Sequence, residues 1–78
     1  MTYKPATREE TLKNLKEKVE LGWKSIRIDS KRQRWAIESV GIALKEGWVD
    51  TGEFHDFPEQ QYSYYSYGLN HDAIREAR

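Results

Sequence analysis

The 78-residue sequence lacks cysteine and long hydrophobic runs, and it contains only two prolines. Without cysteine the chain can form neither a disulfide bond nor a thiolate zinc site, so we expect a reducing compartment, the cytoplasm. Because the longest apolar runs are only a few residues, we expect neither a transmembrane helix nor a signal-peptide core. The length fits one small domain, residues 1–78, with residues 1–6 and 76–78 frayed at its ends.

The sequence also has no net charge, with 13 basic and 13 acidic side chains. It therefore carries no overall field that would attract nucleic acid or an anionic membrane. Its charged fraction of 33% would fit a disordered chain, but its aromatic fraction of 13% argues for a folded one. The charges are unevenly distributed, since residues 1–47 hold a net charge of +4 and residues 48–78 a net charge of −4.

Three segments carry the signals of helices. In the first two, a capping box opens an amphipathic stripe of apolar residues three and four positions apart. Both end at a glycine, which favours the left-handed C-cap conformation, followed by a tryptophan. A third, short helix begins at an asparagine cap. The predicted helices are residues 7–21, capped by Thr7 and Glu10 and ended by Gly22; residues 30–46, capped by Ser30 and Gln33 and ended by Gly47; and the segment from Asn70 through Ile74.

Strand signals separate these helices. Residues 23–29 alternate between side chains of different polarity, with isoleucines on one side and an arginine on the other. Residues 48–57 and 62–69 form a hairpin, because Pro58 favours a turn between them. The sequence therefore predicts a single α+β domain of order α-β-α-β-β-α, in which a three-stranded antiparallel sheet packs on two main helices.

The second predicted helix is apolar on two sides. Ile37, Val40 and Leu44 form one face, and Trp35 and Ile42 lie nearly opposite. One interpretation is that one side packs on the sheet and the other on a neighbouring helix. The alternative is that Trp35 and Ile42 form an exposed anchor for a partner.

The last predicted strand alternates two sets of large side chains, and one set should face the core. Tyrosine is a good strand former, so packing alone explains most of the pattern. Stacking on nucleic-acid bases and binding to a protein groove are the alternatives. The inward set is Tyr65, Tyr67 and Leu69, and the outward set is Tyr62 and Tyr64, paired with Phe54 or Phe57 across the hairpin.

Charged residues cluster in two places. Basic side chains lie on both sides of the start of the second predicted helix, and acidic side chains lie along the predicted hairpin. A solvated helix start and a solvated hairpin would explain both clusters. The alternative is a bipolar molecule, with a basic site on one side and an acidic, aromatic site on the other. The basic cluster is Lys24, Arg27, Lys31, Arg32 and Arg34, and the acidic one is Asp50, Glu53, Asp56 and Glu59.

Signals for catalysis or metal binding are few. Glu53 and His55 share one face of a strand and could chelate a metal, but no third or fourth ligand follows at a recognised spacing. Each histidine precedes an aspartate, in His55–Asp56 and His71–Asp72, and adjacent strand residues point to opposite faces, which disfavours a proton relay within a pair. We therefore expect a non-enzymatic protein with no catalytic residue, metal or cofactor.

The C-terminal half, residues 43–50 and 64–70, resembles the end of a winged helix-turn-helix domain. In that family the recognition helix ends in a Leu-Lys/Glu-x-Gly-hydrophobic step, here Leu44 to Trp48, before a two-stranded wing rich in tyrosine. The family places two helices where residues 30–46 predict one, and its wing carries Lys or Arg where this hairpin is acidic. The resemblance implies nucleic-acid binding, with Lys24, Arg27, Lys31, Arg32 and Arg34 on phosphates and Gln33 or Ser39 near base edges.

Two functions fit these patterns. The first is a small winged-helix-like regulatory protein that binds nucleic acid through the basic helix start. The alternative is a protein-binding inhibitor or adaptor, of the size and composition of phage or bacterial accessory proteins, that recognises a basic partner surface. We expect no membrane partner, and a monomer or a homodimer formed through Trp35. For the alternative, the anchors are Trp35, Ile42, Tyr62 and Tyr64, and the charges that select the partner are Glu53 and Asp56.

Overall fold

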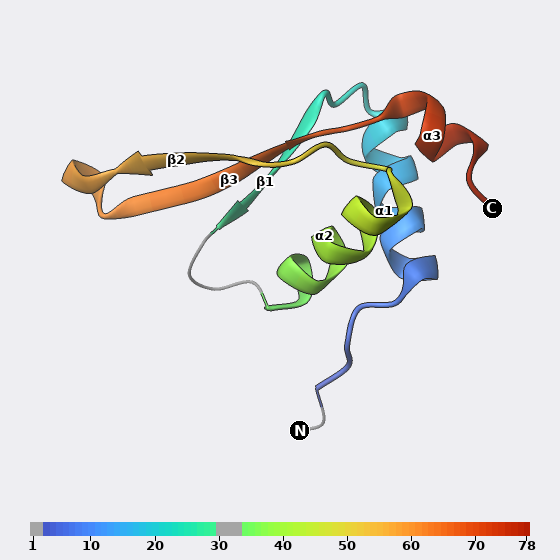
Figure 1. Cartoon of the computed structure of the whole chain (residues 1–78), viewed down its shortest axis with the longest axis horizontal. Helices are drawn as coiled ribbons and strands as arrows, with labels where there is room; N and C mark the ends of the chain where they lie inside the picture. Colours follow the sequence, from blue (N-terminus) through green and yellow to red (C-terminus); the bar gives the residue numbers. More distant parts are fainter. Residues whose placement is uncertain (1–2, 30–33) are drawn as a thin grey trace.

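A computed structural model describes residues 3–29 and 34–78, and it confirms the predicted α+β class, element order and antiparallel sheet. The two longer helices lie on the same side of the sheet, and the hairpin projects beyond them (Figure 1). No helix in the described part of the chain is long and apolar enough to cross a membrane. The elements are α1 (Arg8–Glu20), β1 (Ser25–Asp29), α2 (Arg34–Glu46), β2 (Glu53–Phe57), the 3₁₀ turn η1 (Pro58–Gln60), β3 (Tyr62–Gly68) and α3 (His71–Glu76).

The helix starts that fall in the described residues are capped as predicted. At α1, the Glu10 amide donates a hydrogen bond to Thr7 Oγ1 (3.2 Å). At α3, the Ala73 amide donates to Asn70 Oδ1 (3.3 Å). The capping box predicted for α2 lies at residues 30–33, outside the described residues. Side-chain caps therefore fix where α1 and α3 begin.

Both glycine–tryptophan pairs end their helices as predicted. Gly22 and Gly47 adopt positive φ angles of 81° and 77°. The amides of Trp23 and Trp48 then donate to carbonyl oxygens five residues earlier, at 3.0 and 2.9 Å, which completes a Schellman motif at each end. The two tryptophans differ beyond this point. Trp48 is buried in the core, whereas Trp23 is exposed and the Lys18 ammonium lies over its ring.

The core forms where the three helices meet the start of the hairpin segment. One polar pair is buried within it, since Ser39 Oγ of α2 donates a hydrogen bond to Thr11 Oγ1 of α1 at 2.9 Å. Ser39 donates and Thr11 accepts, so each of these two oxygens has a hydrogen-bond partner at the crossing of α1 and α2. The hydrophobic core comprises Leu12, Leu15, Val19, Ala43, Trp48, Val49 and Ile74.

The predicted core face of α2 is only partly correct. Val40 is buried, but Ile37 and Leu44 are 52% and 40% exposed. Instead, α2 is buried along the small side chains of Ser39 and Ala43, which lie between its two apolar sides. Small residues let the axes of α1 and α2 approach closely, whereas apolar periodicity favours the larger side chains on the flanks. The buried stripe is therefore rotated away from the predicted one.

The sheet has the strand order β1-β3-β2, so the last strand is central. Of the predicted strand 48–57, only Glu53–Phe57 forms β2, while Val49 makes an isolated bridge to Leu69 and is buried. Gly52 lies between these parts of the chain, and a Cβ built there would meet the Tyr67 ring at 2.6 Å. A larger residue at position 52 would therefore force the Tyr67 ring to move.

Candidate functional site

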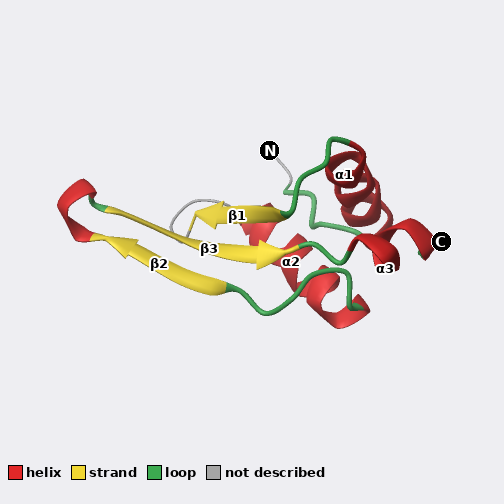
Figure 2. Cartoon of the chain, turned by 90° about the horizontal axis from the view of Figure 1, so that it is seen from above, coloured by secondary structure: helices red, strands yellow, loops and turns green. Residues whose placement is uncertain are grey.

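The outer face of the sheet points away from the helices, and the strands lie in front of them when the molecule is viewed from above (Figure 2). Tyr65 and Tyr67 of β3 face inward, because they line a cavity of about 140 Å³ together with Ile37 and Val40 of α2. Since side chains alternate along a strand, Tyr62 and Tyr64 point to the outer face. We call the residues that gather there the outer aromatic face: Arg27, His55, Phe57, Tyr62 and Tyr64.

Strand pairing builds this face around the ring of Tyr64. The β2–β3 register places His55 opposite Tyr64, and the two rings stack with centroids 5.0 Å apart and planes 27° apart. From the other neighbouring strand, the Arg27 guanidinium lies 4.8 Å from the same ring. Tyr64 is therefore flanked by a histidine from β2 and by an arginine from β1.

Two further rings extend the outer aromatic face toward the tip of the hairpin. Phe57 pairs with Tyr62 in the register, and their rings stack at 6.5 Å with planes 16° apart. Phe57 also lies 6.0 Å from Tyr64, and Tyr62 lies 5.5 Å from it. Phe57 and Tyr62 remain 41% and 39% exposed. The rings thus stabilise one another while leaving much of their surface accessible.

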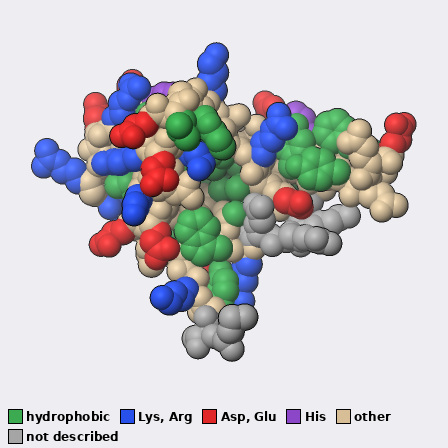
Figure 3. Space-filling model, turned by 180° about the vertical axis from the view of Figure 1, so that it is seen from behind, with side chains coloured by type: hydrophobic (Ala, Val, Ile, Leu, Met, Phe, Trp, Pro, Cys, Tyr) green, Lys and Arg blue, Asp and Glu red, His purple; other side chains and the backbone are tan. Residues whose placement is uncertain are grey.

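The tip of the hairpin extends past the rest of the sheet. β1 pairs only with the part of β3 from Tyr64 to Gly68, so Tyr62 is supported by β2 alone. Figure 1 shows the resulting arm, and hydrophobic side chains gather over it in the space-filling view (Figure 3). The arm carries exposed apolar surface away from the core.

Acidic side chains lie on both faces of the hairpin, and we call them the acidic rim: Glu53 on the outer aromatic face, Asp56 on the inner face and Glu59 in the turn η1. Glu53 is on the same face as His55, as predicted, and its Oε2 lies 3.7 Å from His55 Nε2. The Glu53 side chain is 82% exposed, and Asp56 and Glu59 are also exposed. The described residues contain no group of three or more side chains that could hold a metal ion. The rim is therefore available for electrostatic contact with a positively charged surface.

The inner face of the hairpin holds the remaining aromatic side chains. Phe54 pairs with Tyr65, and their rings lie 5.0 Å apart. Of the two phenylalanines that could pair with Tyr62 and Tyr64, the structure thus selects Phe57. Phe54 is exposed as well, and Tyr65 is 39% exposed, the same fraction as Tyr62. The two faces of the hairpin therefore offer tyrosines of equal exposed fraction for comparison, Tyr62 on the outer face and Tyr65 on the inner.

The basic cluster is divided among several contacts. Arg27 lies over Tyr64, while Arg34 lies over the ring of Tyr3 (4.0 Å) and pairs with Glu38 (3.5 Å). Lys24 is exposed at the start of β1. The other two members of the predicted cluster, at positions 31 and 32, lie outside the described residues. The described part of the cluster therefore includes two arginines that are engaged with different rings.

The two predicted anchors of α2 are both half-buried. Ile42 packs against the hydrophobic core. Trp35 lines a cavity of about 150 Å³ between α1, β1 and α2, which Trp23 also lines. Both side chains are only half-buried because α2 faces the core with its stripe of small residues, so that each apolar side lies at the flank of the helix.

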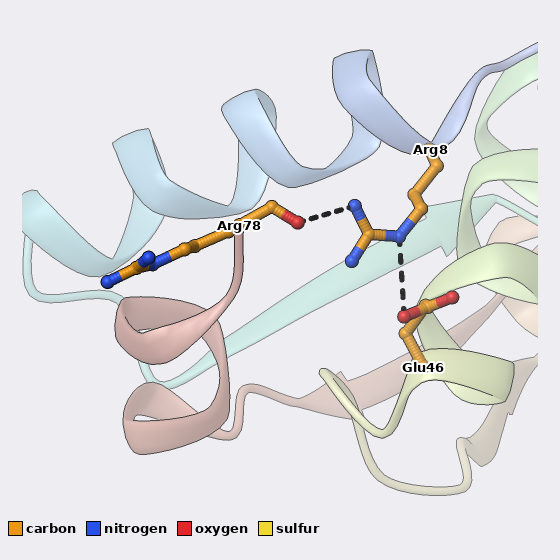
Figure 4. Close-up of polar contacts among 3 residues, drawn as sticks. All are labelled: Arg8, Glu46 and Arg78. Carbon is orange, nitrogen blue, oxygen red and sulfur yellow. Dashed lines mark hydrogen bonds and ion pairs between the residues drawn. The ribbon is translucent and has the colours of Figure 1, made fainter.

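A second polar cluster, which the sequence did not indicate, joins the start of α1 to the C-terminal residue and to α2. Arg8 of α1 pairs with Glu46 of α2 (Nε–Oε2 3.4 Å) and donates to the Arg78 carbonyl oxygen (2.8 Å) (Figure 4). The Arg8 guanidinium also lies 5.0 Å from the Trp48 ring. These partners are far apart in sequence, and no local pattern predicts such contacts. Because Arg8 is engaged by these contacts within the protein, the cluster holds α1 against α2 and the C-terminus. We therefore take the outer aromatic face as the candidate functional site.

Comparisons with family models, with curated proteins and with solved structures found no match to this chain. Between β1 and β2, the described residues form one helix, α2. The function must therefore be argued from the surface of the molecule itself.

Proposed function

We propose that this protein is a small binding module that recognises a partner protein through its outer aromatic face. The observation that carries the proposal is the exposed ladder of rings on the hairpin arm, where Phe57 and Tyr62 continue the stack around Tyr64. Clustered aromatic side chains that remain exposed are typical of protein interfaces, in which they supply most of the binding energy. The role is that of an inhibitor or adaptor and requires no catalytic group.

The arrangement of the rings favours a protein over single-stranded nucleic acid. Base stacking needs an open ring face, but Tyr64 is approached by His55 from one neighbouring strand and by Arg27 from the other. Nucleic acid also needs positive charge beside the rings to neutralise its phosphates. Here Arg27 supplies one positive charge, but the other nearby exposed side chains include Glu53 and Glu59.

The rim implies a basic partner. Glu53, Asp56 and Glu59 lie on or next to the strand that carries Phe57. A partner with lysine or arginine around an apolar centre would match both the rings and the rim. Because the acidic side chains are exposed, salt screens them, and association should slow as ionic strength rises.

Capture of partners from a nuclease-treated lysate of the source cell tests the proposal. Tyr62→Ala should abolish capture of the specific partner, whereas Tyr65→Ala should retain it. The two tyrosines lie on the same strand with the same exposed fraction of 39%, but on opposite faces. Thermal unfolding of both variants checks that each is folded. Equal capture by wild type and Tyr62→Ala would contradict the proposal.

Nucleic-acid binding is the second candidate, and the exposed positions of Lys24, just before β1, and Arg27 on β1 favour it. If the protein binds nucleic acid, it would act as a winged-helix-like regulator. Titration of duplex DNA at increasing salt tests this function, since phosphate contacts give a steep salt dependence. Absence of binding at low salt would remove it, and binding that survives Tyr62→Ala but is lost in Lys24→Ala with Arg27→Ala would support it.

A further inference from the structure

The hairpin has a free edge next to the outer aromatic face. In the strand order β1-β3-β2, β2 pairs with β3 on one side only. Figure 2 shows no described element alongside its other edge. On that edge, alternate residues direct backbone N–H and C=O groups away from the sheet, where an added strand can pair with them.

This edge lacks proline, glycine and lysine, but it is short and carries two carboxylates, which discourage pairing with any strand that is not basic. Pro58 follows only after the strand. The side chains are instead acidic and aromatic in turn, with Glu53 and Asp56 three residues apart and Phe54 and Phe57 also three residues apart. An added strand would therefore meet an acidic and an aromatic side chain at each end of β2.

The charges on the edge distinguish between two possible occupants. If a second copy of this chain paired antiparallel through the whole of β2, Glu53 would lie opposite Phe57 and Asp56 opposite Phe54. The carboxylates would then face no basic side chain, and two acidic edges placed side by side repel at low salt. A basic strand gains attraction at the same positions. The acidic side chains therefore disfavour self-pairing and favour a positively charged strand.

We propose that β2 binds an extended segment of a partner protein by strand addition, with basic residues opposite Glu53 and Asp56 and apolar residues opposite Phe54 and Phe57. This inference rests on the proposed protein-binding function and adds where and how the partner binds. The segment would extend the sheet to four strands, and its apolar residue beside Phe57 would continue the outer aromatic face. Backbone hydrogen bonds would supply affinity, and the alternating side chains would supply specificity.

A designed peptide tests strand addition directly. In antiparallel register, residues opposite Phe57 through Glu53 read Val-Lys-Thr-Val-Lys, so the probe is this sequence flanked by threonines and labelled with a fluorophore. Two control peptides carry N-methyl groups on alternate residues, one control for each set. Only one set of amides faces β2 in an added strand. We expect one control to bind at least about tenfold more weakly than the probe, and the other to bind within about twofold of it.

Charge reversal of the edge provides a matched protein control. Glu53→Lys with Asp56→Lys should weaken binding of the probe at least about tenfold. Glu17→Lys with Glu20→Lys makes the same change in net charge at exposed positions of α1 and should leave binding within about twofold. Equal weakening by the two double variants would show a nonspecific charge effect and overturn the proposal.

The remaining outcomes separate this inference from the proposed function. Partner capture by Tyr62→Ala and Tyr65→Ala tests the proposed function, whereas binding of the designed peptides to the wild-type protein tests strand addition alone. Equal binding of the two N-methylated peptides, or no saturable binding of the probe at low salt, would overturn strand addition without affecting the capture experiment. A dimer in sedimentation that the probe dissociates would assign the edge to a second copy and would also overturn it.

Discussion

Small side chains govern how closely the elements of this domain approach one another. Ser39 and Ala43 form the stripe of α2 that is buried, and the Thr11 hydroxyl is paired at the same crossing. At Gly52 the backbone lies against the Tyr67 ring. The effect of a substitution at these positions on the free energy of unfolding therefore depends on whether the added atoms have space and whether a buried hydroxyl loses its partner.

Two glycines should respond in opposite directions to alanine. Gly52→Ala places a Cβ 2.6 Å from the Tyr67 ring, so we expect a loss of about 1–3 kcal/mol in the free energy of unfolding. Gly41→Ala lies in α2 with no atom within 4 Å of the added Cβ, so we expect a gain of about 0.5–1 kcal/mol. Urea denaturation measures both changes, and a stabilising Gly52→Ala would contradict the close contact.

The buried hydroxyl pair should show non-additive behaviour. Ser39→Ala leaves the Thr11 hydroxyl buried without its partner, and we expect a loss of about 1–2 kcal/mol in the free energy of unfolding. Adding Thr11→Val removes the second polar group at similar volume and should recover part of that loss. A double-mutant cycle in urea measures the coupling, and simple additivity of the two changes would argue against the bond.

Among the elements, the segment before α1 is tied to α2 by side chains. The Tyr3 hydroxyl donates a hydrogen bond to the Glu38 carboxylate, and the Arg34 guanidinium lies over the Tyr3 ring. Arg34 also pairs with Glu38, one turn further along α2. The contact thus depends on the ionisation state of a phenol and a carboxylate.

The pKa of Tyr3 should lie above its ordinary value of 10.0, chiefly because its hydroxyl donates to the Glu38 carboxylate. A raised pKa in the folded state means that the contact contributes fully below the pKa of the unfolded chain and is lost as pH rises through the folded-state value. Glu38→Gln removes the negative charge and should lower the pKa of Tyr3. Titration of ¹³C-labelled tyrosine by NMR measures it, and an identical pKa in the two proteins would rule out the contact.

The sequence predicted elements more reliably than it predicted contacts. Caps at Thr7 and Asn70 and stops at Gly22 and Gly47 are local, so they could be identified from a few neighbouring residues. The buried stripe of α2 depends on which helix packs against it, and periodicity alone did not find it. The alternation of β3 was predicted, but the selection of Phe57 required the register of the hairpin.

The whole molecule separates its stabilising interactions from its candidate binding surface. The helices and the Arg8 cluster gather at one end, while the hairpin arm extends from the other (Figure 1). The net charge of −4 in residues 48–78 includes the acidic rim of this arm. Substitution of the exposed aromatic side chains on the arm should therefore have little effect on the packing of the core.

That separation predicts different consequences for the two ends. Tyr62→Ala should lower the free energy of unfolding by less than about 1 kcal/mol, because this ring is itself 39% exposed and packs against the exposed ring of Phe57 and the half-buried ring of Tyr64. Ile74→Ala should lower it by about 2–5 kcal/mol, because Ile74 is fully buried. Thermal and urea unfolding compare them, and a large loss from Tyr62→Ala would mean that the arm is part of the stabilising core.

Site-specific photo-crosslinking in the source cell tests the central claim most directly. A photoreactive phenylalanine derivative replaces Tyr62 in one version of the protein and Tyr65 in the other, two positions of equal exposed fraction on opposite faces of the hairpin. The proposed function predicts a discrete crosslink to a protein from position 62 that is weak or absent from position 65. Crosslinks to nucleic acid from position 62, or equal protein crosslinks from both positions, would contradict the assignment of the outer aromatic face.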